Sequence, residues 1–204
     1  MLYTCSSCTL HTCEKPGVGA YPKNCPVLQK EFMEEVKARY EPYLEFFSQC
    51  ARIEAEGYCQ WPRLRETIEV CQRMGYKKIG LAFCAGFRNE AKIVEELLRS
   101  KGFQVVSAVC KVGGIDKEDI GMTPDCKINP GGYEPMCNPI GQAEMLNISG
   151  TDFNIVLGLC VGHDSLFLKH SEALATVLVA KDRVMAHNPC GAIYTAKGYC
   201  KTKL

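Results

Sequence analysis

Residues 154–164 constrain the fold of this chain more than any other stretch. Their first half is a continuous apolar run, the pattern of a strand that is buried on both faces of a parallel sheet. The second half leaves the strand through Cys160 and Gly162 and presents His163 and Asp164 where a helix should begin. The stretch therefore predicts a buried strand that turns into a helix, with a thiol at the turn.

The same arrangement of apolar run, cysteine and glycine occurs twice earlier, ending in Cys84 and in Cys110. Open α/β sheets bind ligands in the crevice at the carboxyl ends of their strands. We therefore expect Cys84, Cys110 and Cys160 to surround one crevice, and we interpret them as ligands of a metal or an iron–sulfur cluster. The alternative is that three buried cysteines simply pack as small apolar residues.

The order of apolar runs predicts an α/β fold with a small, open, mainly parallel sheet of about four strands and flanking helices. Strands are expected at residues 78–84, 104–110, 154–160 and 175–181, with helices at 88–101 and 163–170. The helix at 88–101 should cover the sheet with Ala91, Val94, Leu97 and Leu98. Right-handed crossovers give the simplest strand order, 2-1-3-4. The topological switch point then falls between Cys84 and Cys160.

Fourteen cysteines in 204 residues are the unusual feature of the composition. The start of the chain has no basic and apolar leader, so we expect a cytoplasmic protein in which cysteines serve metal binding or redox chemistry. The apolar runs are too short to cross a bilayer. A net charge of +1, evenly mixed along the chain, indicates neither nucleic acid nor membrane as a partner.

Residues 1–26 form a cysteine-rich head with almost no periodic pattern, and we place a domain boundary there, with 27–204 as the second part. The ligand candidates are Cys5, Cys8, Cys13 and Cys25. Two cysteines separated by two residues can direct both thiolates at one ion, and a later cysteine can complete the cage. We expect zinc or a second iron–sulfur cluster here. A disulfide-stapled or disordered head is the alternative.

The beginning of the second part, residues 27–74, has a helical pattern. A helix starting near Pro42 should bury Tyr43, Phe46, Phe47 and Cys50, and another should run over 62–74.

Residues 112–141 form a long irregular segment with several glycines and prolines. We interpret it as a lid that brings Cys137 to the crevice, the alternative being a simple surface excursion.

Strand spacing bears on the metal in the crevice. Neighbouring strands lie about 4.8 Å apart, which puts Cys110 and Cys160 about 10 Å apart at the backbone, with Cys84 between them. Zinc holds sulfur at about 2.3 Å, so an iron–sulfur cluster, of the four-iron type, suits three strand ends and a lid better than one zinc ion. Because Cys137 lies on a loop, it should be the most exchangeable ligand.

Three polar residues beside these ligands are candidates for catalysis: Lys111, His163 and Asp164. A cation at Lys111 would offset thiolate charge or bind an anionic substrate, and His163 could transfer protons. For His163 and Asp164 the alternative is an ordinary helix cap.

Several motifs recur in one family: the paired head cysteines with Asn24-Cys25-Pro26, Lys111–Lys117, Met136–Ile140, Leu159–Asp164 and Lys181–Arg183 with His187-Asn188-Pro189. Through them the chain resembles the uncharacterised cysteine-rich metal-binding proteins of anaerobic prokaryotes, a domain of unknown function. The resemblance covers nearly the whole chain. It implies metal binding and a cytoplasmic setting but no reaction. Its pattern includes Cys84, Cys110, Cys137, Cys160 and the four head cysteines, and leaves Cys126 and Cys190 unassigned.

Three functions agree with these features. The protein could be an iron–sulfur enzyme that carries out redox or sulfur-transfer chemistry on a small molecule. It could be an electron-transfer module with two clusters and a redox partner, or a zinc-binding storage or sensor protein. The sequence favours the enzyme and leaves the oligomeric state open.

Overall fold

The computed structural model describes residues 3–15, 17 and 19–204. The chain divides into two compact units, Met1–Glu56 and Gly57–Leu204. The boundary expected after residue 26 lies inside the first of these units and stays a prediction. The first helix, α1 (Lys30–Ala38), packs against the short turn Pro26–Leu28, and this contact joins the helix to the head.

The second unit contains the sheet, which has four strands in the order β2-β1-β3-β4. The strands are β1 (Lys78–Phe83), β2 (Gln104–Val109), β3 (Phe153–Leu157) and β4 (Ala175–Val179). All three strand pairs are parallel. The α/β class, the open parallel sheet and the strand order predicted from the sequence are therefore confirmed.

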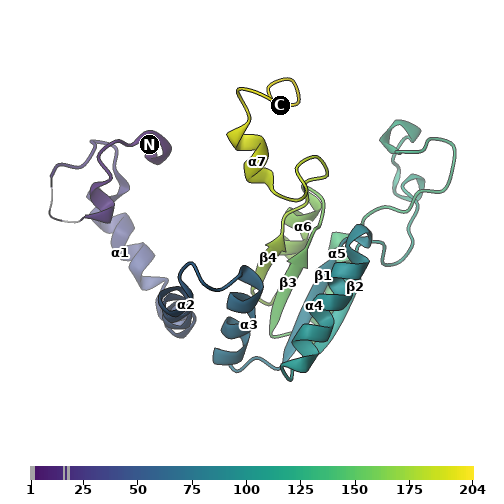
Figure 1. The fold of residues 1–204 in the computed structure, drawn as a ribbon, viewed down its shortest axis with the longest axis horizontal. Helices are drawn as coiled ribbons and strands as arrows, with labels where there is room; N and C mark the ends of the chain where they lie inside the picture. Colours follow the sequence, from purple (N-terminus) through teal and green to yellow (C-terminus); the bar gives the residue numbers. More distant parts are fainter. Residues whose placement is uncertain (1–2, 16, 18) are drawn as a thin grey trace. The chain divides into compact units, whose positions relative to one another are not determined.

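The helices of this unit are α3 (Arg63–Arg73), α4 (Arg88–Ser100), α5 (Pro139–Ile148), α6 (His163–His170) and α7 (Pro189–Tyr194). Both α4 and α5 contact β1 and β2, from opposite faces of the sheet, and α6 packs beside α5 (Figure 1). The central strand β3 pairs with β1 on one side and β4 on the other and is buried at all five positions, in agreement with its continuous apolar run.

Helix α4 corrects one sequence expectation. Ala91, Val94 and Leu98 are buried as expected, but Leu97 keeps 38% of its surface exposed. The three buried positions follow the three- and four-residue spacing of a single stripe, and Leu97 lies beside that stripe.

Two contacts fix the strand ends that carry the cysteines. The fully buried Gln142 of α5 donates from Nε2 to the carbonyl oxygens of Phe83 (3.2 Å) and Ala108 (2.7 Å). These two hydrogen bonds hold α5 against the carboxyl ends of β1 and β2. Gly158, with φ +64°, lies against the Phe87 ring, and a Cβ there would come within 2.3 Å of that ring. The edge beyond β1, β2 and β3 is thus closely packed.

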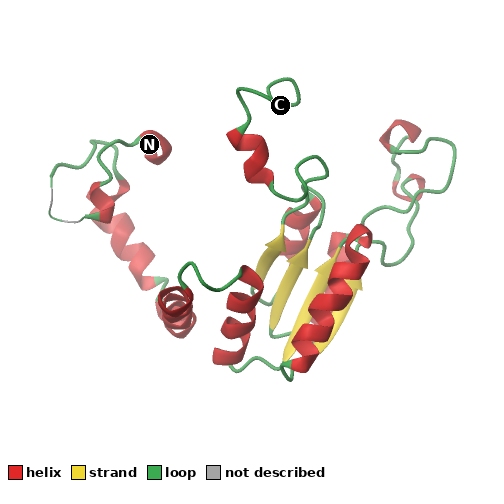
Figure 2. Ribbon diagram, in the orientation of Figure 1, coloured by secondary structure: helices red, strands yellow, loops and turns green. Residues whose placement is uncertain are grey.

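The first unit is helical (Figure 2). It contains α1, most of α2 (Leu44–Gly57) and short 3-10 turns at Cys5–Ser7, Thr12–Glu14, Pro26–Leu28 and Glu41–Tyr43. Tyr43 and Phe47, expected to face inward, remain 48% and 51% exposed. The Phe47 ring packs against Tyr40 at a centroid distance of 5.1 Å, so these aromatic residues pack on the surface. Within the described residues, no helix has the length and apolar character needed to span a membrane.

Candidate metal centre

The two cysteines after β1 and β2 continue the hydrogen-bond ladder of the sheet. The backbone N–H of Cys84 donates to Leu157 O (3.1 Å), and that of Cys110 donates to Phe83 O (2.8 Å). Both residues are buried. The Cys110 thiol accepts from the backbone N–H of Ala85 (3.3 Å) and interacts with the thiols of both Cys84 and Cys137. Three of the predicted ligands therefore meet at one edge of the sheet.

Cys137 is held in place by the residue that follows it. The backbone N–H of Asn138 donates to Cys110 O (2.7 Å), and its side-chain amide donates to Val112 O (3.2 Å). The same side chain accepts from Gly141 N (2.8 Å) and so caps α5. The loop thus delivers Cys137 at a fixed point between β2 and α5.

The other side of Cys137 meets the turn after β3. The ligand atoms of Cys137, Cys160 and His163 all lie within 4.8 Å of one another, close enough to hold one metal ion. Gly162, with φ +80°, lets the chain turn here, and Cys160 O accepts from His163 N (3.0 Å) and Asp164 N (3.1 Å). The Nδ1 atom of His163 is buried and has no hydrogen-bond partner among the described residues. A metal would satisfy this nitrogen.

Asp164 is oriented along its own helix. Its carboxylate accepts from the N–H of the next residue, Ser165 (2.8 Å). The N-cap of α6 is Gly162 and has no side-chain cap bond, so neither His163 nor Asp164 is the helix cap of the alternative interpretation.

Three basic side chains reach three of the thiols. Lys181 Nζ lies 2.6 Å from Cys84 Sγ, Lys111 Nζ lies 3.3 Å from Cys137 Sγ, and Arg183 Nη2 lies 3.2 Å from Cys160 Sγ. The sequence singled out Lys111 but assigned no role to Lys181 or Arg183. The signal for them was their position directly after β4, because parallel strands all end at the same edge of the sheet.

These contacts shift the thiol pKa values in opposite directions. The hydrogen bond from Cys110, helped by Lys181, lowers the pKa of Cys84 to about 4. The hydrogen bond from Cys110, together with the charge of Lys111, lowers the pKa of Cys137 to about 5. The hydrogen bonds to Cys137 and Cys84 raise the pKa of Cys110 well above its ordinary value. These shifts favour the thiolate forms of Cys84 and Cys137, and the thiolate is the form of cysteine that binds metal.

The loop that carries Lys181 and Arg183 is internally bonded. Asp182 Oδ1 accepts from Val184 N (2.9 Å) and Met185 N (2.8 Å), and His187 Nδ1 accepts from Asp182 N (3.1 Å). The ring of His187 packs on Phe87 with centroids 4.6 Å apart. His187 therefore shapes the basic loop and points its Nδ1 at the backbone.

The segment before Cys137 is organised by charge. Lys127 is buried and contacts Asp116 (3.2 Å), Glu118 (2.6 Å) and Gly132 O (2.7 Å), and Lys117 pairs with Glu134. An isolated antiparallel bridge joins Asp116 to Pro135. Ion pairs and a β-bridge therefore hold this segment together, and its last residues include Cys137. Cys126, in its middle, is exposed.

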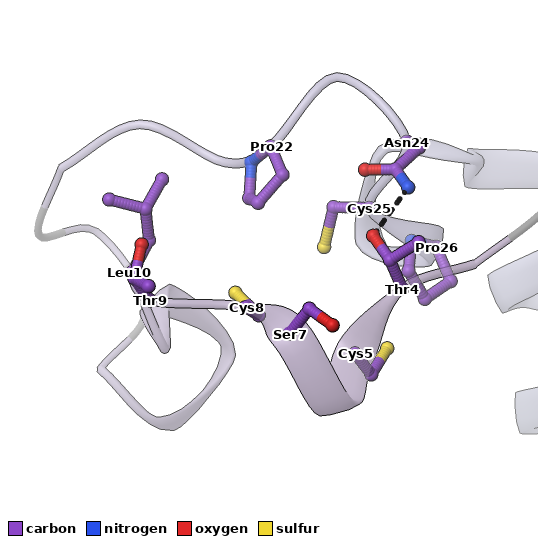
Figure 3. A pocket seen from close by; sticks show the side chains of 10 residues that line it. All are labelled: Thr4, Cys5, Ser7, Cys8, Thr9, Leu10, Pro22, Asn24, Cys25 and Pro26. Carbon is purple, nitrogen blue, oxygen red and sulfur yellow. Dashed lines mark hydrogen bonds between the residues drawn. The ribbon is translucent and has the colours of Figure 1, made fainter.

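In the head, Cys5, Cys8 and Cys25 line a pocket of about 270 Å³ (Figure 3). Asn24 Nδ2 donates to Thr4 Oγ1 (2.9 Å) across this pocket and brings the two cysteine segments together. Cys13 is exposed and does not line the pocket. Of the described residues, only Cys137, Cys160 and His163 form a group of three ligand side chains whose ligand atoms all lie within 4.8 Å of one another, so the head cysteines line one pocket but form no such group.

The comparisons with known proteins find a family of unknown function and an uncharacterised relative. The chain is 49% identical over 201 residues to uncharacterized protein MJ0455 of the archaeon Methanocaldococcus jannaschii, an alignment that covers 98% of this chain and 97% of that protein. Residues 25–178 match the model of a protein family of unknown function, DUF1847. The matched region includes Cys84, Cys110, Cys137, Cys160 and His163. The chain belongs to the DUF1847 family.

Proposed function

We propose that this protein is an iron–sulfur enzyme that carries out redox or sulfur-transfer chemistry on a small molecule at the carboxyl edge of its sheet. One observation supports the proposal above all: Cys137 lies next to Cys110 on one side and is grouped with Cys160 and His163 on the other. Three thiols at this edge each contact a cation. Purely structural cysteines need no such cations, whereas a cluster of thiolates does.

The ligand set fits iron and sulfide. Cys84, Cys110, Cys137 and Cys160 would supply four thiolates, the usual ligands of an iron–sulfur cluster. Lys111, Lys181 and Arg183 would offset the negative charge of that centre, and His163 could move a proton beside it. When bound, the cluster would supply electron transfer or a Lewis-acidic iron.

A second candidate is a mononuclear centre held by Cys137, Cys160 and His163. The 4.8 Å grouping of these three ligand atoms favours it. Three protein ligands and one open position are the pattern of a catalytic metal site, and zinc or iron would both accept this donor set. Cys84 and Cys110 would then be a separate thiol pair beside the metal.

For the head we propose a structural zinc ion or a second cluster bound by Cys5, Cys8, Cys13 and Cys25. Binding would draw Cys13 toward the pocket that the other three already line. A second cluster there would give the two-centre arrangement of an electron-transfer protein. Because free thiols persist in a reducing compartment, we place the activity in the cytoplasm.

The test is the metal and sulfide content and the visible spectrum of protein purified without oxygen, for the wild type, Cys84→Ser and His163→Ala. We expect a brown protein with iron and acid-labile sulfide, whose crevice iron is lost in Cys84→Ser. A mononuclear site would instead survive Cys84→Ser and lose its metal in His163→Ala. A colourless wild-type protein with zinc alone would refute the iron–sulfur proposal.

A further inference from the structure

A cavity of about 240 Å³ opens beside the candidate metal centre. Cys137 and His163, two of the three grouped ligands, form part of its wall. The rest of the wall comes from the segment before Cys137, from the start of α5 and from α6. The metal centre and the cavity therefore share two residues.

The rest of the wall is mostly apolar. Ile115, Ile120, Ile140 and Leu166 line it and keep 37%, 52%, 41% and 40% of their surfaces exposed. None of the lining residues is a lysine, arginine, aspartate or glutamate. Exposed apolar side chains gathered around a hollow mark a binding surface more often than a random cluster does.

This wall is built in advance of any ligand. Ile115 O accepts from Met136 N (2.7 Å), and the bridge between Asp116 and Pro135 follows directly. Ile120 ends the turn Glu118–Ile120, whose first residue is paired with the buried Lys127. The charge network of the segment thus holds two isoleucines at the cavity.

The cavity can accept only a small molecule. An apolar protein cavity of about 150 Å³ is large enough for benzene. About 240 Å³ therefore suits an aromatic or aliphatic body slightly larger than benzene. The absence of charged lining residues disfavours an ionic ligand, because a buried charge needs a partner.

We propose that this cavity binds the apolar body of a small uncharged thiol, with the sulfur directed at the metal beside Cys137 and His163. The inference rests on the proposed metal centre and adds the substrate class to it. Thiolate sulfur is a soft donor that suits a metal already held by cysteines. On binding, the thiolate would replace the Cys137 thiolate at a four-cysteine centre, or a water at the open position of the three-ligand centre. The thiol proton would pass to the released Cys137 or to water, so no oxidant or reductant would be consumed.

Calorimetric titration of metal-containing protein, purified without oxygen and analysed for metal beforehand, tests the proposal. Benzyl mercaptan should bind at least about tenfold more tightly than 2-mercaptoethanol, since burying an aromatic body contributes roughly 1.5–3 kcal/mol. Benzyl alcohol, which keeps the body and lacks sulfur, should bind about as weakly as 2-mercaptoethanol or more weakly. Removing the metal should weaken benzyl mercaptan but not benzyl alcohol.

A matched pair of variants on α5 supplies the control. Ile140→Gln should reduce the preference for benzyl mercaptan severalfold and leave 2-mercaptoethanol unchanged. Ile148→Gln, at a residue 85% exposed and outside the cavity, should change neither. Equal affinity of metal-containing protein for the two thiols would overturn this inference alone. Protein that holds no metal at the crevice would overturn the proposed function and this inference together.

Discussion

The head and the crevice each present four candidate cysteine ligands, but they position them differently. In the crevice, Cys84 and Cys110 extend a sheet and Cys137 is fixed by Asn138. In the head, Cys5 and Cys13 lie on three-residue turns and are exposed. A few side-chain bonds hold that region, such as Thr12 Oγ1 to Ala20 O (2.9 Å).

This difference indicates that the crevice folds without metal, whereas the head depends on metal for its order. The crevice is supported by a core of strands and helices and should exist without metal. Among the described residues of the head there is no buried apolar side chain, so its order should come largely from the metal itself, as in small zinc-binding modules. Four predictions follow from this comparison, from the largest expected effect to the smallest.

Metal removal should separate the two regions most clearly. After chelation, amide exchange in the head should accelerate at least about 100-fold, because local opening is limited there mainly by ligand bonds. Exchange in β1 and β3 should change less than about threefold. Hydrogen exchange read by mass spectrometry measures both in one sample.

The double variant Cys5→Ser, Cys8→Ser should reproduce the head effect without chelator. If β1 and β3 lose protection to the same extent, the two regions form one cooperative unit and the comparison fails.

Within the crevice, Cys137→Ser should have the largest effect. Cys137 contacts Cys110 on one side and is grouped with Cys160 and His163 on the other, so its loss removes the ligand between them. We expect crevice metal affinity to fall at least about 100-fold, more than the 10–100-fold typical of a supporting residue. Competition with a coloured chelator measures it.

The exposed Cys126 of the same segment provides the control, since Cys126→Ser should retain the metal. Retention in Cys137→Ser together with loss in Cys160→Ser would show that Cys137 is the exchangeable ligand, as its position on a loop suggested.

The fold was predictable where the residue pattern of a single helix or strand indicates which of its faces are buried. The run at β3 is apolar at nearly every position because the strand is buried along its whole length, and this pattern predicted a parallel sheet. The strand order followed from right-handed crossovers between consecutive strands. Leu97 was misplaced because a helix pattern gives the direction of the buried stripe more reliably than its width.

The site was predictable only in part. A cysteine at the end of a strand is visible in the sequence, but the contacts of Lys181 and Arg183 with Cys84 and Cys160 depend on a loop that closes through Asp182 and His187. The wall of the cavity likewise depends on the buried Lys127, a residue type that is rarely buried. Such polar networks form only once the chain has folded.

The cations of the crevice should support the metal without holding it. Lys181→Met removes the charge that contacts Cys84 and should weaken crevice metal binding about tenfold, the lower part of the range for supporting residues. Head metal should be unaffected. Metal competition assays on the double head variant isolate the crevice, and Lys197→Met, at an exposed position of the tail, is the matched control. Equal losses in both lysine variants would show a general charge effect.

The smallest effect concerns the thiolates of the metal-free crevice. With pKa values of about 4 and about 5, Cys84 and Cys137 are both ionised at pH 7 and take up protons only as the pH falls through 5 and then 4. Ultraviolet thiolate absorbance should therefore persist at pH 7 and disappear in this acid range, in the wild type and in the double head variant alike. In Lys181→Met the midpoint of Cys84 should rise while that of Cys137 stays, because the shared hydrogen bond from Cys110 remains. If absorbance appears only above about pH 8, where an ordinary cysteine ionises, the crevice thiols are not ionised before metal binds. The crevice and the head would then not differ in this respect.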